Sequence, residues 1–377
     1  MKKADIGIVG GGIAGLTAAI HLASCGLKVL LFEKEKYPHH KVCGEYLSRE
    51  ILPYLESLNI SLESLNPKLI DQLLYSTPSG KTIKTDLKSG GIGISRYALD
   101  NYLYEKAKDY NVDIIHQSVT IINFEDEAFK IKTANNQIFS AKLVLGAYGK
   151  RSGLDKKLNR GFIGKKSGWL AVKAHYKLDT YPNNRVSLHN FEGGYCGLSK
   201  TETGAVNVCY LASYESFKNY KSIDSYKEEV LCKNPLLKTF FDEAVPLFET
   251  DLSIAQVSFE KKSIVEDHIL MLGDAAGLIH PLCGNGMAMA FHSAKLASES
   301  ILKYYDPKAF SRTDIEKEYI KKWNHQFKSR IKIGSVLQKI LLKPVLAEAS
   351  QNIIKLVPSL LPFIITKTHG KPVICVK

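Results

Sequence analysis

The first residues whose types and spacing could do chemistry are three glycines near the N-terminus. Gly10, Gly12 and Gly15 follow an apolar segment, residues 5–9, and precede a helical stretch, residues 16–24. In this setting the first glycine permits a tight turn out of a strand, the second lets the backbone approach a pyrophosphate, and the third lets the helix pack closely on the strand. The helix N-terminal amides then face the phosphates. The pattern predicts a dinucleotide-binding loop, and a merely structural glycine turn is the alternative.

An acidic residue at the expected distance supports the first interpretation. A second apolar run, residues 28–32, ends at Glu33, about 20 residues beyond the loop, where a carboxylate can accept a hydrogen bond from a ribose hydroxyl. Ala14 and Lys34 lie beside these positions and belong to the predicted binding set. Strand, loop, helix, strand and acid together form a βαβ unit.

A second group of glycines and an acid follows a late apolar segment, residues 268–272. Gly273 and Asp274 come directly after it, and Gly284, Asn285 and Gly286 lead into a predicted helix from about residue 286 to residue 304. Alone, a Gly-Asp pair is more often an ordinary helix cap. At these positions, however, the chain resembles the flavoprotein family that contains p-hydroxybenzoate hydroxylase, geranylgeranyl reductases and flavin-dependent halogenases. The resemblance implies that the aspartate binds the ribityl chain of FAD and that residues 284–286 lie beside the isoalloxazine. A helix N-terminus there can stabilise an anionic reduced flavin.

Two further segments are similar to that family. Residues 41–48, Lys-Val-Cys-Gly-Glu-Tyr-Leu-Ser, resemble a stretch of the geranylgeranyl reductases that runs along the flavin. This implies that Cys43 lies near the ring and could donate a proton or gate access; the alternative is a small buried residue, because free cysteine usually packs as an apolar side chain. Arg96 matches an arginine that contacts FAD in the family, and its alternative is an exposed arginine at a helix start.

The segment 144–152 matches the family with one departure. Gly149 is present and stays in the predicted FAD set, but Tyr148 stands where the family has an aspartate tied to both FAD and NAD(P)H. A tyrosine cannot supply the carboxylate, which weakens a hydroxylase-like use of NADPH and leaves the FAD prediction intact.

The fold class we predict is α/β: a Rossmann-like FAD-binding domain with an inserted, mostly β substrate domain and a C-terminal helical region. The expected divisions are residues 1–155, with substrate-domain pieces near 50–90, then 156–265 for the substrate domain, 266–305 for the return to the FAD domain, and 306–377 for the basic helical region. Residues 156–265 match no substrate motif. Tyr195 lies at the approximate place of a substrate-side aromatic segment in the reductases, so Tyr195 and Cys43 are the candidate catalytic residues.

Charge is concentrated at the end of the chain. The chain has 51 Lys and Arg residues and 38 Asp and Glu residues, so its net charge is +13. Residues 306–377 hold 14 basic and 5 acidic residues and therefore carry +9 of this charge. A nucleic-acid partner is not expected, because such proteins carry their basic residues on the main fold. The apolar stretches of this region are shorter than the ~20 residues of a membrane span. The region is therefore either an interfacial helix on a membrane or a helical cap on the fold.

Seven scattered cysteines without metal-ligand spacing favour a reducing compartment and no metal site. The first residues do not resemble a signal peptide. These observations predict a cytoplasmic protein, with peripheral membrane association through residues 306–377 as an extension.

The leading hypothesis is an FAD-dependent reductase or dehydrogenase of the geranylgeranyl reductase-like branch, delivering hydride from flavin N5 to a small hydrophobic or lipid-like substrate. NAD(P)H, reduced ferredoxin or another donor would supply the electrons. One alternative is a flavin monooxygenase working through a C4a-hydroperoxide, and another is a non-catalytic flavin-binding protein that docks on membranes. Halogenation ranks low, because the two tryptophans, Trp169 and Trp323, lie far apart and form no WxWxIP motif.

Overall fold

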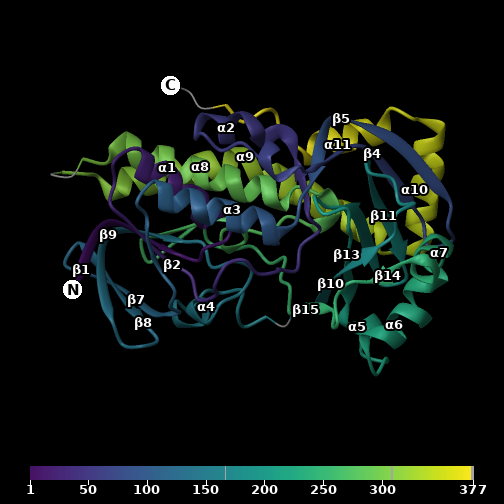
Figure 1. Cartoon of the computed structure of the whole chain (residues 1–377), viewed down its shortest axis with the longest axis horizontal. Helices are drawn as coiled ribbons and strands as arrows, with labels where there is room; N and C mark the ends of the chain where they lie inside the picture. The colour runs from purple at the N-terminus through teal and green to yellow at the C-terminus, as the bar shows by residue number, and fades with distance from the viewer. Residues whose placement is uncertain (166, 307–308, 375–377) are drawn as a thin grey trace.

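The computed structural model describes residues 1–165, 167–306 and 309–374, which form two lobes with a helical region across them (Figure 1). The first lobe contains a parallel sheet whose central strand is β1. Its strands are, in spatial order, β17 (Ile269–Met271), β9 (Ile138–Gly146), β1 (Lys2–Val9), β2 (Val29–Phe32) and β6 (Asp113–Ile115). β16 (Val265–Glu266) extends the β17 edge, and the hairpin of β7 (Val119–Glu125) and β8 (Ala128–Thr133) joins β9.

Apolar sequence explains this sheet and the helices that cover it. β2 is buried at every position, as expected of a parallel strand that is covered on both faces. The helices α1 (Ile13–Ser24), α3 (Arg96–Asp109) and α8 (Gly286–Tyr304) pack together on the sheet. β1, β2 and β9 end side by side at Val9, Phe32 and Gly146. In an open parallel sheet ligands bind at this carboxyl edge, and the glycine loop begins there.

The second lobe is a mostly antiparallel sheet. It contains β3 (Tyr46–Ser48), β4 (Lys68–Ser76), β5 (Thr82–Gly93), β10 (Trp169–Lys177), β11 (Arg185–Phe191), β12 (Gly194–Lys200), β13 (Val206–Ser213), β14 (Val245–Pro246) and β15 (Leu252–Ala255). Segments that precede β9 (residues 46–93) and segments that follow it (residues 169–255) therefore both contribute strands to this sheet. β10 alternates in strand fashion: Val172 and Ala174 pack in one cluster with the helices that follow β13, and Ala171 packs in another cluster on the opposite face.

The remaining helices are short. They are α2 (Leu52–Ser57), α4 (Gly153–Lys157), α5 (Tyr214–Phe217), α6 (Ile223–Glu229), α7 (Pro235–Glu243) and the single-turn 3₁₀ segments η1 (Arg49–Ile51), η2 (Glu63–Leu65), η3 (Leu231–Lys233), η4 (Gly273–Ala275) and η5 (Pro281–Cys283). Three of them, α5 to α7, cover the outer face of the second sheet. Its inner face is left toward the first lobe.

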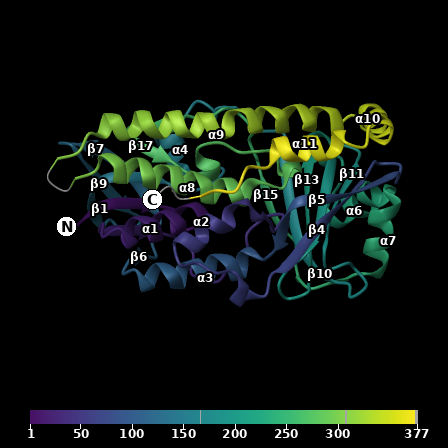
Figure 2. The same ribbon diagram turned by 90° about the horizontal axis from the view of Figure 1, so that it is seen from above.

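The basic C-terminal region lies against both lobes. α9 (Arg312–Leu341) runs along the length of the molecule (Figure 2) and buries Ile315, Tyr319, Trp323 and Phe327 against the first lobe. α10 (Pro344–Leu356) and α11 (Leu360–Thr368) follow beside the second sheet. Pro344 begins α10, and Pro362 lies in the first turn of α11, where the missing amide costs little. Among the described helices none is by itself long and apolar enough to span a bilayer, although α10 and α11, bent by 114°, reach that length and composition as a pair.

The predicted fold class is confirmed. A Rossmann-like α/β lobe, an inserted β sheet and a C-terminal helical region are all present. The predicted helix 286–304 matches α8 at both ends.

Candidate functional site

One cavity of about 1360 Å³ connects the two lobes. It starts at the carboxyl edge of the parallel sheet, follows the inner face of the second sheet and reaches the C-terminal helices. Small-molecule sites usually measure about 300–1,000 Å³, so this cavity has room for a large cofactor and a second molecule.

The glycine loop forms the first end of the cavity. Gly10 has a φ of +108°, and a side chain there would meet the carbonyl oxygen of Ala147 at 2.4 Å. A Cβ on Gly15 would lie 1.9 Å from the oxygen of Gly10, so the third glycine gives the close helix–strand contact that its position predicts. Gly12 and Ala14 line the cavity, with the guanidinium of Arg96 3.5 Å from where a Gly12 Cβ would lie.

Glu33 lies at the end of β2 with its carboxylate held by backbone amides. Gly11 N donates to Oε2 at 2.8 Å, and Glu35 N donates to Oε1 at 3.0 Å. Each carboxylate oxygen has a further lone pair, and Glu33 and Lys34 both line the cavity. Glu33 can therefore accept a hydrogen bond from a ribose hydroxyl while it also holds the glycine loop through Gly11.

Arg96 is not the exposed arginine of the alternative interpretation. It begins α3, lines the cavity and makes two 2.7 Å hydrogen bonds to Asp100, which Lys41 also contacts at 2.9 Å. Burial alone would raise the pKa of Asp100, but the two cations hold it below its usual value. The cluster keeps a net positive charge beside the glycine loop, which suits an anionic pyrophosphate.

The loop that carries Cys43 is fastened to the second sheet by side chains. Nζ of Lys173, on β10, donates to the carbonyl of Lys41 at 3.2 Å, and Nδ2 of Asn207, on β13, donates to that of Cys43 at 3.1 Å. Ser199, on β12, contacts the Gly44 carbonyl at 3.4 Å. β10, β12 and β13 thus hold the segment 41–44, which forms one wall of the cavity.

Glu45 is the central anchor of this loop. It is fully buried with a left-handed backbone (φ +53°), and its carboxylate contacts Lys173 Nζ at 2.5 Å and His175 Nε2 at 2.7 Å. The Arg96 amide donates to it at 2.7 Å. Burial would raise the pKa of Glu45, but the hydrogen bond with His175 and the charge of Lys173 lower it.

His40 completes this cluster on the cavity side. One of its ring nitrogens lies within 4.8 Å of a carboxylate oxygen of Glu45 and of a ring nitrogen of His175, but the Lys173 ammonium already neutralises the carboxylate that a cation would need. Burial and the Lys173 charge lower the pKa of His40 to about 4, so its imidazole is neutral at pH 7. Sequence reasoning missed Lys173 and His175, although their i, i+2 spacing on a predicted strand placed both on one face.

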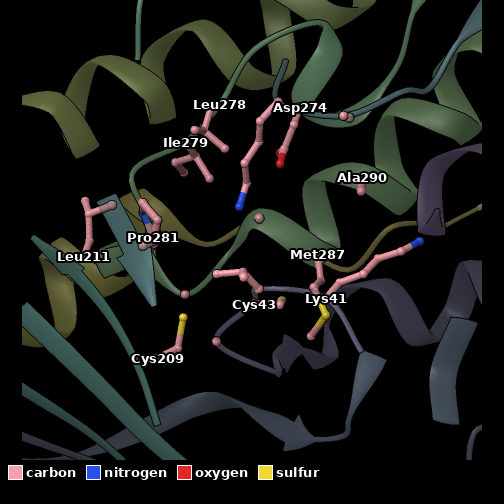
Figure 3. Close-up of a pocket in the computed structure, with 18 of the residues that line it drawn as sticks. Lys41, Cys43, Cys209, Leu211, Asp274, Leu278, Ile279, Pro281, Met287 and Ala290 are labelled. Carbon is pink, nitrogen blue, oxygen red and sulfur yellow. The ribbon is translucent and has the colours of Figure 1, made fainter. Parts of the chain in front are cut away.

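Asp274 and the loop beyond it form another wall of the cavity, and Leu278 of this loop packs against Tyr195 and Leu211 of the second sheet (Figure 3). Gly273, with φ +54°, makes the turn after β17, and Gly284, with φ +64°, makes a second one before α8. Both line the cavity, as does Gly286. The side chain of Asn285 points elsewhere: it is buried and donates to the carbonyl of Thr368 at 3.0 Å. Asn285 therefore fastens the end of α11.

Cys43 and Tyr195 both line the cavity, together with Cys209. Figure 3 shows Cys43 beside Met287, and Cys209 and Leu211 on the side of the second sheet. The hydroxyl of Tyr195 accepts from the Leu282 amide at 3.0 Å, which leaves its own proton available to a further acceptor. Burial raises the pKa of Tyr195 well above its usual value and that of Cys209 to about 12.

Tyr148, the departure from the family pattern, follows β9 in the first lobe and lines the cavity. Its hydroxyl contacts the sulfur of Met271 at 3.2 Å, and burial is the main reason that its pKa is raised. Gly149 follows with φ +84° and lines the cavity. The turn is thus preserved without the carboxylate.

The second half of the cavity is apolar. The second sheet contributes Leu73, Leu87, Val186, Leu188, Leu198 and Leu211, and the C-terminal helices contribute Leu337, Ile340, Leu341, Ile353, Ile354, Leu360, Leu361, Ile364 and Ile365. No sequence motif marks these residues, because the apolar type is common and only the fold brings them together.

Residues 3–310 match the family model described as FAD binding domain, and the chain belongs to this family. It is therefore an FAD-dependent oxidoreductase of the p-hydroxybenzoate hydroxylase superfamily. The chain is 26% identical over 370 residues to a digeranylgeranylglycerophospholipid reductase of Methanocaldococcus jannaschii, covering 89% of this chain and 87% of that one. It is 21% identical over 392 residues to conditioned medium factor receptor 1 of Dictyostelium discoideum, covering 93% and 73%. The flavin-dependent brominase Bmp2 shares the fold, with a TM-score of 0.76, 17% identity and coverage of 97% and 94%.

The cavity residues fit FAD, whose prediction is confirmed by the family. The Gly10 and Gly15 contacts leave no room for side chains behind the pyrophosphate loop, Glu33 suits the adenosine ribose, and Arg96 suits the phosphates. Asp274, on the wall beyond, suits the ribityl chain. The individual contacts to FAD remain predictions.

Proposed function

We propose that this flavoprotein reduces carbon–carbon double bonds in a lipid-like, prenyl-containing substrate. The observation that carries the proposal is the continuity of one cavity from the FAD-binding edge to the apolar wall of α9, α10 and α11. The similarity to a digeranylgeranylglycerophospholipid reductase along 89% of the chain supports the same substrate class.

The second half of the cavity suits a long apolar chain. Burying apolar surface gives about 25 cal/mol per Å², and the lining there offers leucine, isoleucine and valine side chains. A small polar aromatic substrate would leave most of this surface without a partner. An isoprenoid chain would place a double bond toward the sheet edge while the rest of the chain contacts the C-terminal helices.

Bound FAD, once reduced, supplies the hydride equivalent for such a reduction. The chain's own residues must then deliver a proton to the other carbon and keep the bond in place. Tyr195 is suited to hold a proton at its hydroxyl, because the Leu282 amide donates to that oxygen and burial keeps the phenol protonated. Cys43 is the second candidate, on the loop that Glu45 fastens. The two variants Tyr195→Phe and Cys43→Ser separate these roles.

The test is an anaerobic reaction of the FAD-loaded protein, chemically reduced, with a lipid that carries geranylgeranyl chains. We expect the product to gain the mass of H₂ for each reduced double bond, as measured by mass spectrometry, while the flavin absorbance of the oxidised form returns. A parallel aerobic reaction with bromide tests the opposite outcome: oxygen consumption with incorporation of one oxygen or bromine atom into the substrate, and no gain of H₂ in the anaerobic sample, would overturn the proposal.

A further inference from the structure

We propose that the outer faces of α10 and α11 dock on an anionic lipid bilayer and that the substrate chain enters the cavity between these helices. The inference deepens the proposed function, because it states where a lipid substrate comes from. It rests on three features of this region: exposed apolar side chains, exposed lysines and the apolar end of the cavity.

The apolar side chains of this region are more exposed than a packed helical cap requires. Val345 is 79% exposed, Leu356 83% and Phe363 58%. Leu346, Ile353 and Val357 are 43%, 52% and 49% exposed. The same short helices bury little else, namely Ala347, Gln351 and Thr368. Clustered exposed apolar residues of this kind mark an interaction surface, and we call the six residues 345, 346, 353, 356, 357 and 363 the apolar surface.

Charge identifies the partner of the apolar surface. Residues 332–371 contain six lysines, all exposed, and one acid, Glu348. That carboxylate is already engaged, because Lys81 lies 2.9 Å from it. Lysines that surround apolar side chains are typical of segments that lie in the interface of an anionic membrane. A protein partner with an apolar groove would not require this excess of positive charge.

The helices are too short and too sharply bent to cross the bilayer as one straight segment. α10 has 13 residues and α11 has 9, and their axes differ by 114°. A span needs about 20 residues. An interfacial position instead lets both helices insert their apolar side chains while the lysines stay at head-group level.

The cavity ends at the same helices. Ile353, half exposed, also lines the cavity, as do Ile354 on α10 and Leu361 and Ile364 on α11. The apolar cavity wall and the apolar surface therefore adjoin on this helix pair and meet at Ile353. A lipid chain can pass from the bilayer to the cavity between them without entering water.

The binding experiment is flotation of the FAD-loaded full-length protein with vesicles of phosphatidylglycerol or of phosphatidylcholine, without substrate or reductant. We expect binding to phosphatidylglycerol and about tenfold or greater weakening with phosphatidylcholine or in the Lys355→Glu, Lys367→Glu double variant. Leu356→Glu should weaken binding similarly. A wild-type protein that floats with neither vesicle, or Leu356→Glu floating like wild type, would overturn the proposal.

Matched controls keep this result specific. Leu247→Glu changes another exposed leucine, 53% exposed, outside the C-terminal region. Lys28→Glu with Lys36→Glu reverses two exposed lysines of the first lobe. Both controls should bind vesicles like wild type and retain their flavin absorbance. Sedimentation without vesicles tests a second copy as the occupant: self-association that Leu356→Glu abolishes would overturn the membrane assignment.

The entry step has its own readout. Leu356→Glu should slow reduction of a geranylgeranyl lipid embedded in vesicles and leave reduction of the same lipid in detergent micelles unchanged. Equal losses in both would overturn entry between α10 and α11. Vesicle binding needs no turnover, so a protein that binds vesicles but reduces no lipid would disprove the proposed function alone.

Discussion

The two ends of the cavity differ in what defines them. At the FAD end, close backbone contacts fix the positions of individual atoms. A Cβ on Gly15 would lie 1.9 Å from the Gly10 carbonyl oxygen, and the Glu33 carboxylate accepts hydrogen bonds from two backbone amides. At the C-terminal end, many interchangeable apolar side chains form the wall. Backbone geometry and charge therefore define the end that is predicted to hold the cofactor, whereas shape and length define the end that is proposed to hold the substrate. The Glu45 cluster fastens the loop 41–45 and the start of α3 to β10 of the second sheet.

The largest effect should come from breaking the Glu45 cluster. Lys173→Met removes the ammonium that contacts the buried Glu45 carboxylate at 2.5 Å, and loss of one partner of a buried ion pair costs about 3–5 kcal/mol. Urea unfolding measures the change. Lys177→Met, an exposed lysine on the same strand, is the control and should have little effect. Equal stability of both variants would show that the cluster does not hold the lobes together.

Acid should weaken the same cluster. The pKa of Glu45 is lowered from its usual value of 4.5 in the folded protein, so its stabilising contribution is complete above that pH and is lost as the pH falls further. The melting temperature of wild type should therefore fall more steeply below about pH 4.5 than that of a Lys173→Met, Glu45→Gln double variant. Parallel curves would contradict this role of Glu45.

At the FAD end, Gly15→Val should remove most of the bound flavin. The new side chain would meet the Gly10 oxygen and force the loop away from α1, and such overpacking costs about 1–3 kcal/mol. Flavin absorbance of the purified protein measures the loss. Gly168→Ala is a suitable control, since nothing lies within 4 Å of its Cβ position.

Asp274→Ala should weaken FAD binding without unfolding the protein. Hydrogen bonds to a charged group contribute about 1.5–3 kcal/mol, which corresponds to roughly a tenfold to hundredfold change in the dissociation constant. Flavin fluorescence titration of the apoprotein gives the value, and Asp179→Ala, an exposed aspartate of the second lobe, provides the comparison. A variant that keeps its full yellow colour would show that the Gly-Asp assignment is wrong.

The FAD end could be predicted from the sequence, and the substrate end could not, for a physical reason. Gly10, Gly12, Gly15 and Glu33 act through local backbone geometry, so a short motif carries the information. The Lys173–Glu45 contact joins residues 128 positions apart. No sequence pattern within either segment predicts that these two side chains meet. Asn285 shows the limit of a motif: it lies in the predicted loop, yet its side chain holds Thr368.

The smallest effect should come from the C-terminal end, where side chains are interchangeable. Ile365→Trp fills part of the apolar wall and should lower kcat/KM for a long-chain substrate by about tenfold, the size of effect expected from the loss of one or two methylene contacts. A short-chain substrate should be unaffected, and so should flavin content. Steady-state kinetics with both substrates checks this, and an equal loss for both would place the effect at the flavin.

The most direct test of the account is the affinity of the oxidised, FAD-loaded protein for isoprenoid alcohols of increasing length, followed by the flavin absorbance. A cavity that runs from the flavin to α11 predicts that each added isoprene unit strengthens binding until the chain reaches the C-terminal helices. It also predicts that Ile365→Trp brings this limit to a shorter chain. An affinity that does not depend on chain length would contradict the account.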